Sequence, residues 1–422
     1  MKNILGYLHS NLTPGEAGSL FWVTVYVLLV FAGVATIVMF MNWFERKAMA
    51  HMQVRLGPMR VGPHGLLQPV ADALKLLLKE DLMPANADKL VFWFAPVTVV
   101  MTAFCGFIVV PFGPTHAITD MNIGVLFMLG VSSLSVLGVI MGGWASNSNY
   151  PLMGSLRSGA QMVSYEVAMA MAVVSAVMMS SMATGTGTLS MIGIVRAQMQ
   201  QHVWFAFSFF PVGLIAFAVF AIAMVAETNR APFDLPEAES ELVAGFLTEY
   251  SGFRWSLFFL AEYAAMIAVS SIATTLWLGG WLRPFPNLLA GKNWDLAFSL
   301  VPGLSFMVAA GLCFFFYTRM PKIRAMRANA IGQAGLGCFL FALGVVLMLP
   351  GVHERIQDIY WFTLKVLGFM YLYIWYRATF PRYRFDQLMK IGWKVLLPIS
   401  IGVVILTALI GVRQELFALV WR

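Results

Sequence analysis

Three glutamates lie in or at the end of apolar runs, where a carboxylate is costly. Glu166 lies in QMVSYEVAMAMAVV, Glu262 lies in LFFLAEYAAMIAV, and Glu45 ends a third run. An ionisable group at that depth in a membrane costs ~2.5 kcal/mol or more on insertion scales, so it usually has a partner or a transport role. One interpretation is a proton path, because a buried carboxyl can exchange protons near neutral pH. The other is an interhelical hydrogen bond that fixes packing.

A second group of carboxylates lies in the stretch AETNRAPFDLPEAESELVAG, residues 226 to 245. Its acidic residues are Glu227, Asp234, Glu237, Glu239 and Glu241. Like charges at close range titrate as a coupled set, which suits proton coupling. Alternatively, Pro236 begins a helix whose first turns carry glutamates, where the helix dipole favours anions. The local pattern fits both interpretations equally.

Other kinds of reactive site have no support in the sequence. Cys105, Cys313 and Cys338 are far apart and lie in apolar runs, without a CxxC motif. That spacing argues against an iron–sulfur or zinc site. The six histidines include no pair at haem-binding spacing within an apolar run, and no phosphate-binding glycine loop occurs. We therefore expect no bound metal, haem or flavin in this chain.

The elements that must position these carboxylates are membrane helices. Of the 422 residues, 60% are hydrophobic and 11% are charged, whereas soluble domains carry about 25% charge. Apolar runs of about 20 residues, long enough to cross the bilayer, recur along the whole chain. They predict an all-α polytopic bundle in one integral membrane domain, 1–422. The ten predicted spans are 19–41, 90–111, 123–143, 159–183, 203–226, 255–280, 298–318, 331–349, 359–376 and 395–412.

Basic residues predict the orientation of these spans. The loops that follow odd-numbered spans hold 19 of the 27 lysines and arginines, and the remaining 8 lie elsewhere. By the positive-inside rule those loops face the cytoplasm and both termini face the outer side of a bacterial inner membrane. The net charge of +7 then reflects topology and not nucleic-acid binding. The acidic loop, 227–250, is placed on the cytoplasmic side.

The first cytoplasmic loop contains an amphipathic segment, 66–80. Leu67, Val70, Leu74, Leu77 and Leu78 recur at helical spacing, opposite polar positions. A helix of this length and pattern lies on the membrane interface and does not cross it.

Four ordered motifs resemble one known family. ERKAMAHMQVRLGPMRVGPHGLLQPVADALKLLLKE is followed by GGWASNSNYPLMGSLRSGAQMVSYE, by AETNRAPFDLPEAESELVAGFLTEYSG with FFLAEYA, and by YRATFPRYRFDQLMKIGWKVLLP. They resemble the H-subunit, or subunit 1, family of proton-pumping NADH:quinone oxidoreductase, respiratory complex I. The resemblance covers residues 19–282 and 359–412.

The resemblance implies a membrane subunit without a redox centre, which forms part of the quinone cavity with hydrophilic partner subunits. Ubiquinone or menaquinone is then the substrate. Small membrane subunits beside the antiporter-like pumps, and lipids, are further partners. The implied proton path and coupling residues are Glu166, Glu227, Asp234, Glu237, Glu239, Glu241 and Glu262. The implied quinone-cavity or interface residues are Glu45, Arg46, Arg55, Asp72, Arg230, Arg377, Arg382 and Arg384.

The sequence departs from the family at residues 283–358. Family members usually have eight spans, whereas two extra apolar runs around a basic turn intervene here. We interpret them as an inserted helical hairpin. Three other functions are compatible with these carboxylates: the anchor of a related energy-converting hydrogenase, a free-standing cation/proton transporter, and a purely structural anchor. An inverted repeat would support a transporter, and none is evident.

Overall fold

The computed structural model describes residues 17–114, 117–185, 187–234, 243–284, 292–319, 327–349 and 351–420. Helices account for almost all of the secondary structure in these ranges, and no strand occurs in them, so the predicted all-α bundle is confirmed. The α-helices are α2 (Ala17–Met52), α3 (Gln68–Leu78), α4 (Lys89–Cys105), α5 (Gly124–Ala145), α6 (Asn149–Thr184), α7 (Met191–Gln201), α8 (Val212–Glu227), α10 (Gly252–Trp277), α11 (Lys292–Arg319), α12 (Arg327–Leu347), α13 (His353–Thr379), α14 (Phe385–Lys390) and α15 (Leu397–Val420). Short 3-10 turns are η1 (Pro63–Gly65), η2 (Gly106–Ile108) and η3 (Gly245–Leu247), and the π-helical turn η5 (Ile391–Leu396) joins α14 to α15.

Eight described helices are long and apolar enough to cross a membrane, and they match eight of the ten predicted spans. The predicted fifth span is α8, which has only 16 residues because it begins after Pro211. The predicted ninth span is α13, whose 27 residues include Lys365. Helix α6 begins ten residues before its predicted span, at Asn149.

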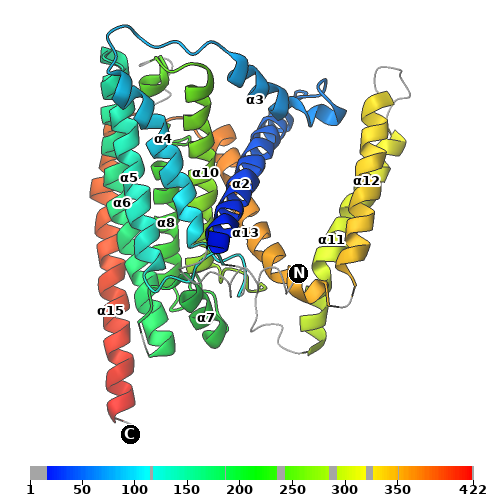
Figure 1. The fold of residues 1–422 in the computed structure, drawn as a ribbon. Coiled ribbons are helices and arrows are strands. Elements are labelled where there is room, and N and C mark those ends of the chain that lie inside the picture. The colour runs from blue at the N-terminus through cyan, green and yellow to red at the C-terminus, as the bar shows by residue number, and fades with distance from the viewer. Residues whose placement is uncertain are drawn as a thin grey trace.

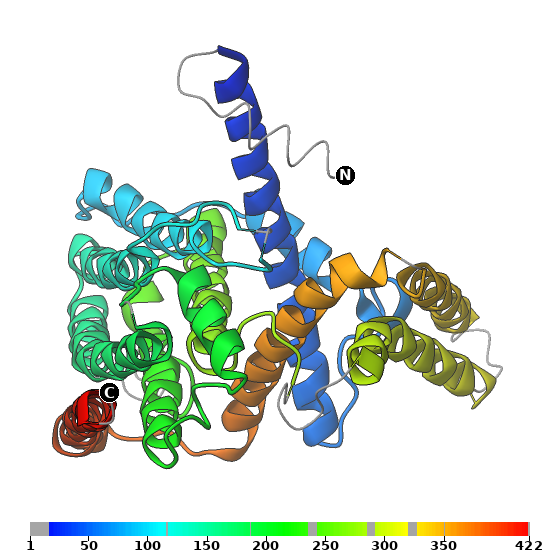
Figure 2. The same ribbon diagram turned by 90° about the horizontal axis from the view of Figure 1, so that it is seen from below.

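The main bundle is built around α6 and α10. Helix α6 packs against α5, α8 and α15, while α10 packs against α4, α13 and α2. Figure 1 shows α4, α5, α6, α8, α10 and α15 together on one side, with α11 and α12 apart from them. The same separation is seen from below in Figure 2, where α13 lies between the bundle and the α11–α12 pair. The carboxylates of interest therefore lie on helices that share one core.

Small residues allow the closest contacts in this bundle. A side-chain Cβ placed on Gly154 of α6 would lie 2.7 Å from the Cα of Gly245 in η3. Helices in membranes rely on such approaches because lipid supplies little hydrophobic drive for association. This contact fixes the chain after the acidic loop against α6.

Helix α3 covers most of the predicted amphipathic segment. Leu74 and Leu77 are exposed on it, and Pro69 is buried. Its location at a membrane interface stays a prediction.

Helices α11 and α12 pack along each other within the range of the predicted hairpin. Phe298 of α11 also packs against Trp361 of α13, with ring centroids 5.9 Å apart. The insertion of this pair relative to the family stays a prediction. In Figure 1, the start of α2 and the end of α15 point toward the lower end, and α3 lies at the upper end. The assignment of these ends to membrane sides also stays a prediction.

Candidate functional site

Four predicted charged residues meet in an arginine-rich cluster, whose Glu45 and Arg230 are buried while Arg377 is exposed. Arg230 Nε lies 2.6 Å from Glu262 Oε1, and Arg230 Nη1 lies 3.4 Å from Glu45 Oε1. Arg377 Nη1 pairs with the same Glu45 oxygen. Glu45 ends up only 3% exposed and Arg230 only 6% exposed. The cluster therefore joins α2, the turn after α8, α10 and α13 through ion pairs.

The cluster has two carboxylates and two guanidinium groups, so its formal charges balance. Burial alone lowers the pKa of Arg230, but Glu262, Tyr263 and Glu45 more than offset it and raise that pKa well above its ordinary value. Arg230 therefore stays charged. Buried ions are tolerated when they are paired and hydrogen-bonded in this way.

Tyr263 completes the cluster, and sequence reasoning missed it. Its hydroxyl donates to Glu45 Oε2, and the Arg230 guanidinium lies 4.4 Å from the centroid of its ring. A cation over an aromatic face is favourable, especially away from water. The available signal was its position next to Glu262, since adjacent helical residues point about 100° apart and can line two sides of one site.

The turn that carries Arg230 is held from α6. The side-chain amide of Gln161 donates to the carbonyls of Ala226 at 2.7 Å and Phe233 at 2.8 Å. At the end of the turn, Asp234 Oδ2 pairs with Arg382 Nη2 at 3.1 Å. The start of the acidic stretch is thus an ordered, buried turn. The helix start predicted at Pro236 lies outside the described residues, as do Glu237, Glu239 and Glu241.

A second group contains Glu166 and Glu227, which lie close enough to interact electrostatically. Ser133 donates a hydrogen bond to Glu166 Oε1, and the Ser132 side chain hydrogen-bonds to Glu227. Glu227 Oε2 is buried and has no hydrogen-bond partner within the described ranges. Neither carboxylate forms an ion pair with another described residue, which distinguishes this group from the arginine-rich cluster.

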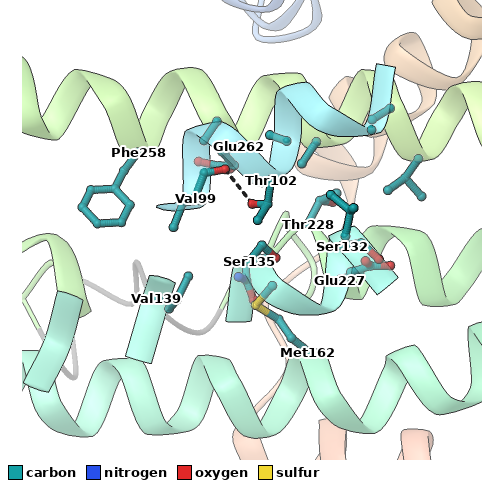
Figure 3. Close-up of a pocket in the computed structure, with 18 of the residues that line it drawn as sticks. Val99, Thr102, Ser132, Ser135, Val139, Met162, Glu227, Thr228, Phe258 and Glu262 are labelled. Carbon is teal, nitrogen blue, oxygen red and sulfur yellow. Dashed lines mark hydrogen bonds between the residues drawn. The ribbon is translucent and has the colours of Figure 1, made fainter. Parts of the chain in front are cut away.

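A cavity of about 100 Å³ lies between these groups. Its lining is mostly apolar, with polar side chains from α4, α5, α8, α10 and the turn after α8: Thr102, Ser132, Ser135, Glu227, Thr228, Asn229, Asp234 and Glu262. In Figure 3, Glu262 lies beside Thr102, and Glu227 lies beside Ser132 farther along the cavity. About 10–15 Å³ is enough to hold one water, so this cavity has room for water beside its polar side chains.

The other predicted residues lie outside this cavity. Arg46 Nη1 of α2 pairs with Asp72 Oδ2 of α3 at 2.7 Å, and both are partly exposed. Arg55 is exposed and donates to the Gln53 side chain at 2.7 Å. Arg384 is exposed at the start of α14. The predicted quinone-cavity residues therefore lie partly in the arginine-rich cluster and partly at the surface.

A partly buried lysine was also missed. Lys365 Nζ on α13 donates to the carbonyls of Leu278, Gly280 and Leu282 at 2.6 to 2.8 Å, and it lies 4.7 Å from the Trp204 ring centroid. A lysine inside an apolar run was the available signal. In the described part of the chain, no group of three or more His, Cys, Asp or Glu residues is placed to hold a metal.

Comparisons with known proteins agree with these features. The model of the NADH dehydrogenase family matches residues 25–336 and 329–408. An NADH-quinone oxidoreductase H subunit of Koribacter versatilis is 67% identical over 418 residues, which cover 99% of this chain and 98% of the relative. The chain belongs to the H-subunit family of NADH-quinone oxidoreductases. An H subunit of Solibacter usitatus is 47% identical over 93% of this chain and 97% of its own length. The H subunit of Rhodospirillum centenum is 40% identical over 92% of this chain and 93% of its own length.

Membership of the H-subunit family confirms the resemblance carried by the four motifs. It also favours the respiratory enzyme over the hydrogenase anchor, because these relatives carry the name NADH-quinone oxidoreductase across nearly the whole chain. As a member of this family, with eight candidate spans in its described ranges, the chain is a multi-pass membrane subunit of an oxidoreductase complex.

Proposed function

We propose that this subunit forms the membrane part of the quinone-binding cavity of the complex and couples quinone reduction to proton translocation. One observation carries the proposal: Glu262 pairs with Arg230 and lines the same cavity as Glu227. A change of charge at the arginine-rich cluster therefore acts on Glu262. This carboxylate lines the same cavity as Glu227, which has no ion pair among the described residues.

The arginine-rich cluster is suited to sense the charge of a reduced quinone. Asp234 and Arg382 are paired beside the buried turn, and Arg377 and Arg230 share Glu45. An added negative charge near these arginines would offset their positive charge. The carboxylates beside them would then bind protons more readily, because a nearby opposite charge is what favours the ionised form of a carboxyl. Interacting carboxylates then titrate together, so one added charge moves more than one proton equilibrium.

The cavity offers a path for the proton that a carboxylate takes up. The hydroxyls of Thr102, Ser132 and Ser135 line it between Glu262 and Glu227. Hydroxyls donate and accept, so they can join water in a hydrogen-bonded chain. Glu227 interacts electrostatically with Glu166, which continues the path into α6. The quinone type stays open between ubiquinone and menaquinone.

The proton path is tested by Glu166→Gln and Glu262→Gln in the assembled complex. Each change removes one titratable group and keeps the side-chain shape. The matched control is Glu80→Gln, because Glu80 is exposed in the first loop. We expect reduced proton pumping and quinone reduction in both variants and no reduction in the control. Normal assembly with unchanged pumping and quinone reduction would exclude the residue from the path.

The quinone-cavity part needs a separate test. A photoreactive quinone analogue added to the intact complex is expected to label residues near Arg46, Asp72, Arg377 or Arg382. Unlabelled quinone should compete. Labelling confined to other subunits, with no competed label in this chain, would overturn this part of the proposal.

A further inference from the structure

The α11–α12 pair contacts the loop between α2 and α3, which is distant from it in sequence. The backbone N–H of His64 donates to Asn329 Oδ1 of α12 at 3.1 Å, across 265 positions of sequence. The Gln333 side chain, one turn farther along α12, lies beside the His64 side chain. Gly332 lies between them and packs directly on Pro63. Helix α12 thus meets η1 with both a polar and a close steric contact.

The loop that α12 contacts has an unfavourable backbone conformation. His64 has φ 52° and ψ 24°, and its neighbours Gly62 and Gly65 have φ of 72° and 74°. A residue other than glycine in the left-handed region persists only when its surroundings hold it there. The contacts around His64 must therefore supply that support.

Support from the other side comes from α2. Lys47 Nζ donates to the carbonyls of Pro58 at 3.1 Å and His64 at 3.3 Å. Trp43 Nε1 also donates to the His64 carbonyl at 3.3 Å. His64 is therefore held through its N–H by α12 and through its carbonyl by α2.

The loop also forms a wall beside the predicted quinone-cavity surface. The crevice between α2 and α3 is closed, with no room for a water molecule, and its walls are Asn42, Trp43, Arg46, Pro58, Gln68, Pro69 and Asp72. Trp43 and Pro58 belong both to this crevice and to the contacts around His64. A shift of the loop would therefore alter the crevice in which Arg46 and Asp72 are paired.

Helix α12 packs mainly on α11 and on η1, and α11 packs on α13. The pair thus spans from α13 at one end to the first loop at the other, as Figure 1 also shows. We propose that the α11–α12 pair is a brace that holds the 58–67 loop against α2 and so fixes the crevice between α2 and α3. Asn329 and Gly332 are its positioning residues. Where it concerns quinone, this inference rests on the proposed function.

The matched test is Gly332→Ala against Gly335→Ala, one turn away on the same helix. A Cβ at position 332 would lie 2.2 Å from the Cβ of Pro63, whereas a Cβ at position 335 meets nothing within 4 Å. Both changes raise helix propensity equally, so a difference between them reports the contact with the loop. Asn329→Ala is a milder second variant that removes the acceptor for the His64 N–H without adding bulk.

The first readout is amide hydrogen exchange of residues 58–67 in the purified complex. We expect exchange about tenfold faster in Gly332→Ala and Asn329→Ala, because a loop that loses its support opens more often. Gly335→Ala should match the parent complex. Equal exchange in all four proteins would overturn the brace.

The second readout is the steady-state kinetics of quinone reduction. We expect a raised KM for quinone with an unchanged kcat in Gly332→Ala, and parental values in Gly335→Ala. Faster exchange with an unchanged KM would overturn the positioning role. Failure of the proposed function is recognised separately, because the photoreactive quinone would then not label this chain in the parent complex, while the exchange difference would remain.

Discussion

Replacing Arg230 by methionine tests whether charge balance stabilises the arginine-rich cluster. Arg230→Met keeps the apolar volume but leaves Glu45 and Glu262 with Arg377 as the one remaining cation of the cluster. Glu45 keeps Arg377 and Tyr263, so the uncompensated charge falls on Glu262. The Glu262 side chain is 22% exposed, so the cost should lie at the low end of the range for a broken buried pair, about 3 kcal/mol.

A double variant tests the reasoning directly. In Arg230→Met/Glu262→Gln the remaining Glu45 and Arg377 balance each other, so we expect most of the lost stability to return. The expected coupling between the two sites is about 2 kcal/mol. The assay is thermal dissociation of the purified complex, where a loss of about 3 kcal/mol should lower the midpoint by roughly 5 °C.

A matched control separates charge balance from the general effect of removing an arginine. Arg46→Met breaks the Arg46–Asp72 pair, which is much more exposed, so it should cost about 0–1 kcal/mol. Destabilisation of the double variant equal to the sum of the two single variants would refute the reasoning. So would equal effects of Arg230→Met and Arg46→Met.

Three further predictions concern positions outside this cluster. Lys365→Met removes the donor for three carbonyls and should destabilise the subunit by roughly 3 kcal/mol, as measured by thermal dissociation. Gly154→Ala places a Cβ 2.7 Å from Gly245 and should cost about 1–3 kcal/mol, whereas Gly130→Ala meets nothing within 4 Å and should be neutral in the same assay. Burial, and to a lesser extent Lys47, lowers the pKa of His64 below 6.5. His64 therefore binds a proton more readily when the loop is detached from α12. The attachment of the loop to α12 is fully stable above pH 6.5 and weakens as the pH falls below it. Amide exchange of the loop relative to His64→Asn should rise from pH 7.5 to pH 5.5, and a constant ratio would contradict this assignment.

Much of the fold could be predicted because apolar length and basic flanks follow directly from the physics of the bilayer. Eight predicted spans meet the length and composition of membrane helices. Helix α8 is shorter than predicted because an apolar run does not reveal where a helix begins, although Pro211 was a usable signal for its start. Helix α13 carries Lys365, whose charge is satisfied by carbonyls at the end of another helix, and no local pattern encodes such a partner.

The candidate site shows the same limit. The costly carboxylates Glu45 and Glu262 could be singled out from their surroundings alone. Their pairing could not, because it depends on how α2, α10 and α13 rotate and cross. Tyr263 was missed for this reason, since a tyrosine in an apolar run has no unusual cost until a carboxylate from another helix faces it. The support of His64 by Asn329 is likewise a contact between distant segments.

The central claim, that carboxylates at the cavity couple quinone reduction to proton movement, is tested most directly at Glu227. This residue is buried in the cavity wall, and the Ser132 side chain hydrogen-bonds to it, so Glu227→Gln removes the titratable group with little change in packing. The measurement is proton translocation together with NADH oxidation by the intact complex in liposomes. We predict that both fall while assembly stays normal. A fully assembled variant that oxidises NADH and translocates protons at the parental rates would contradict the account.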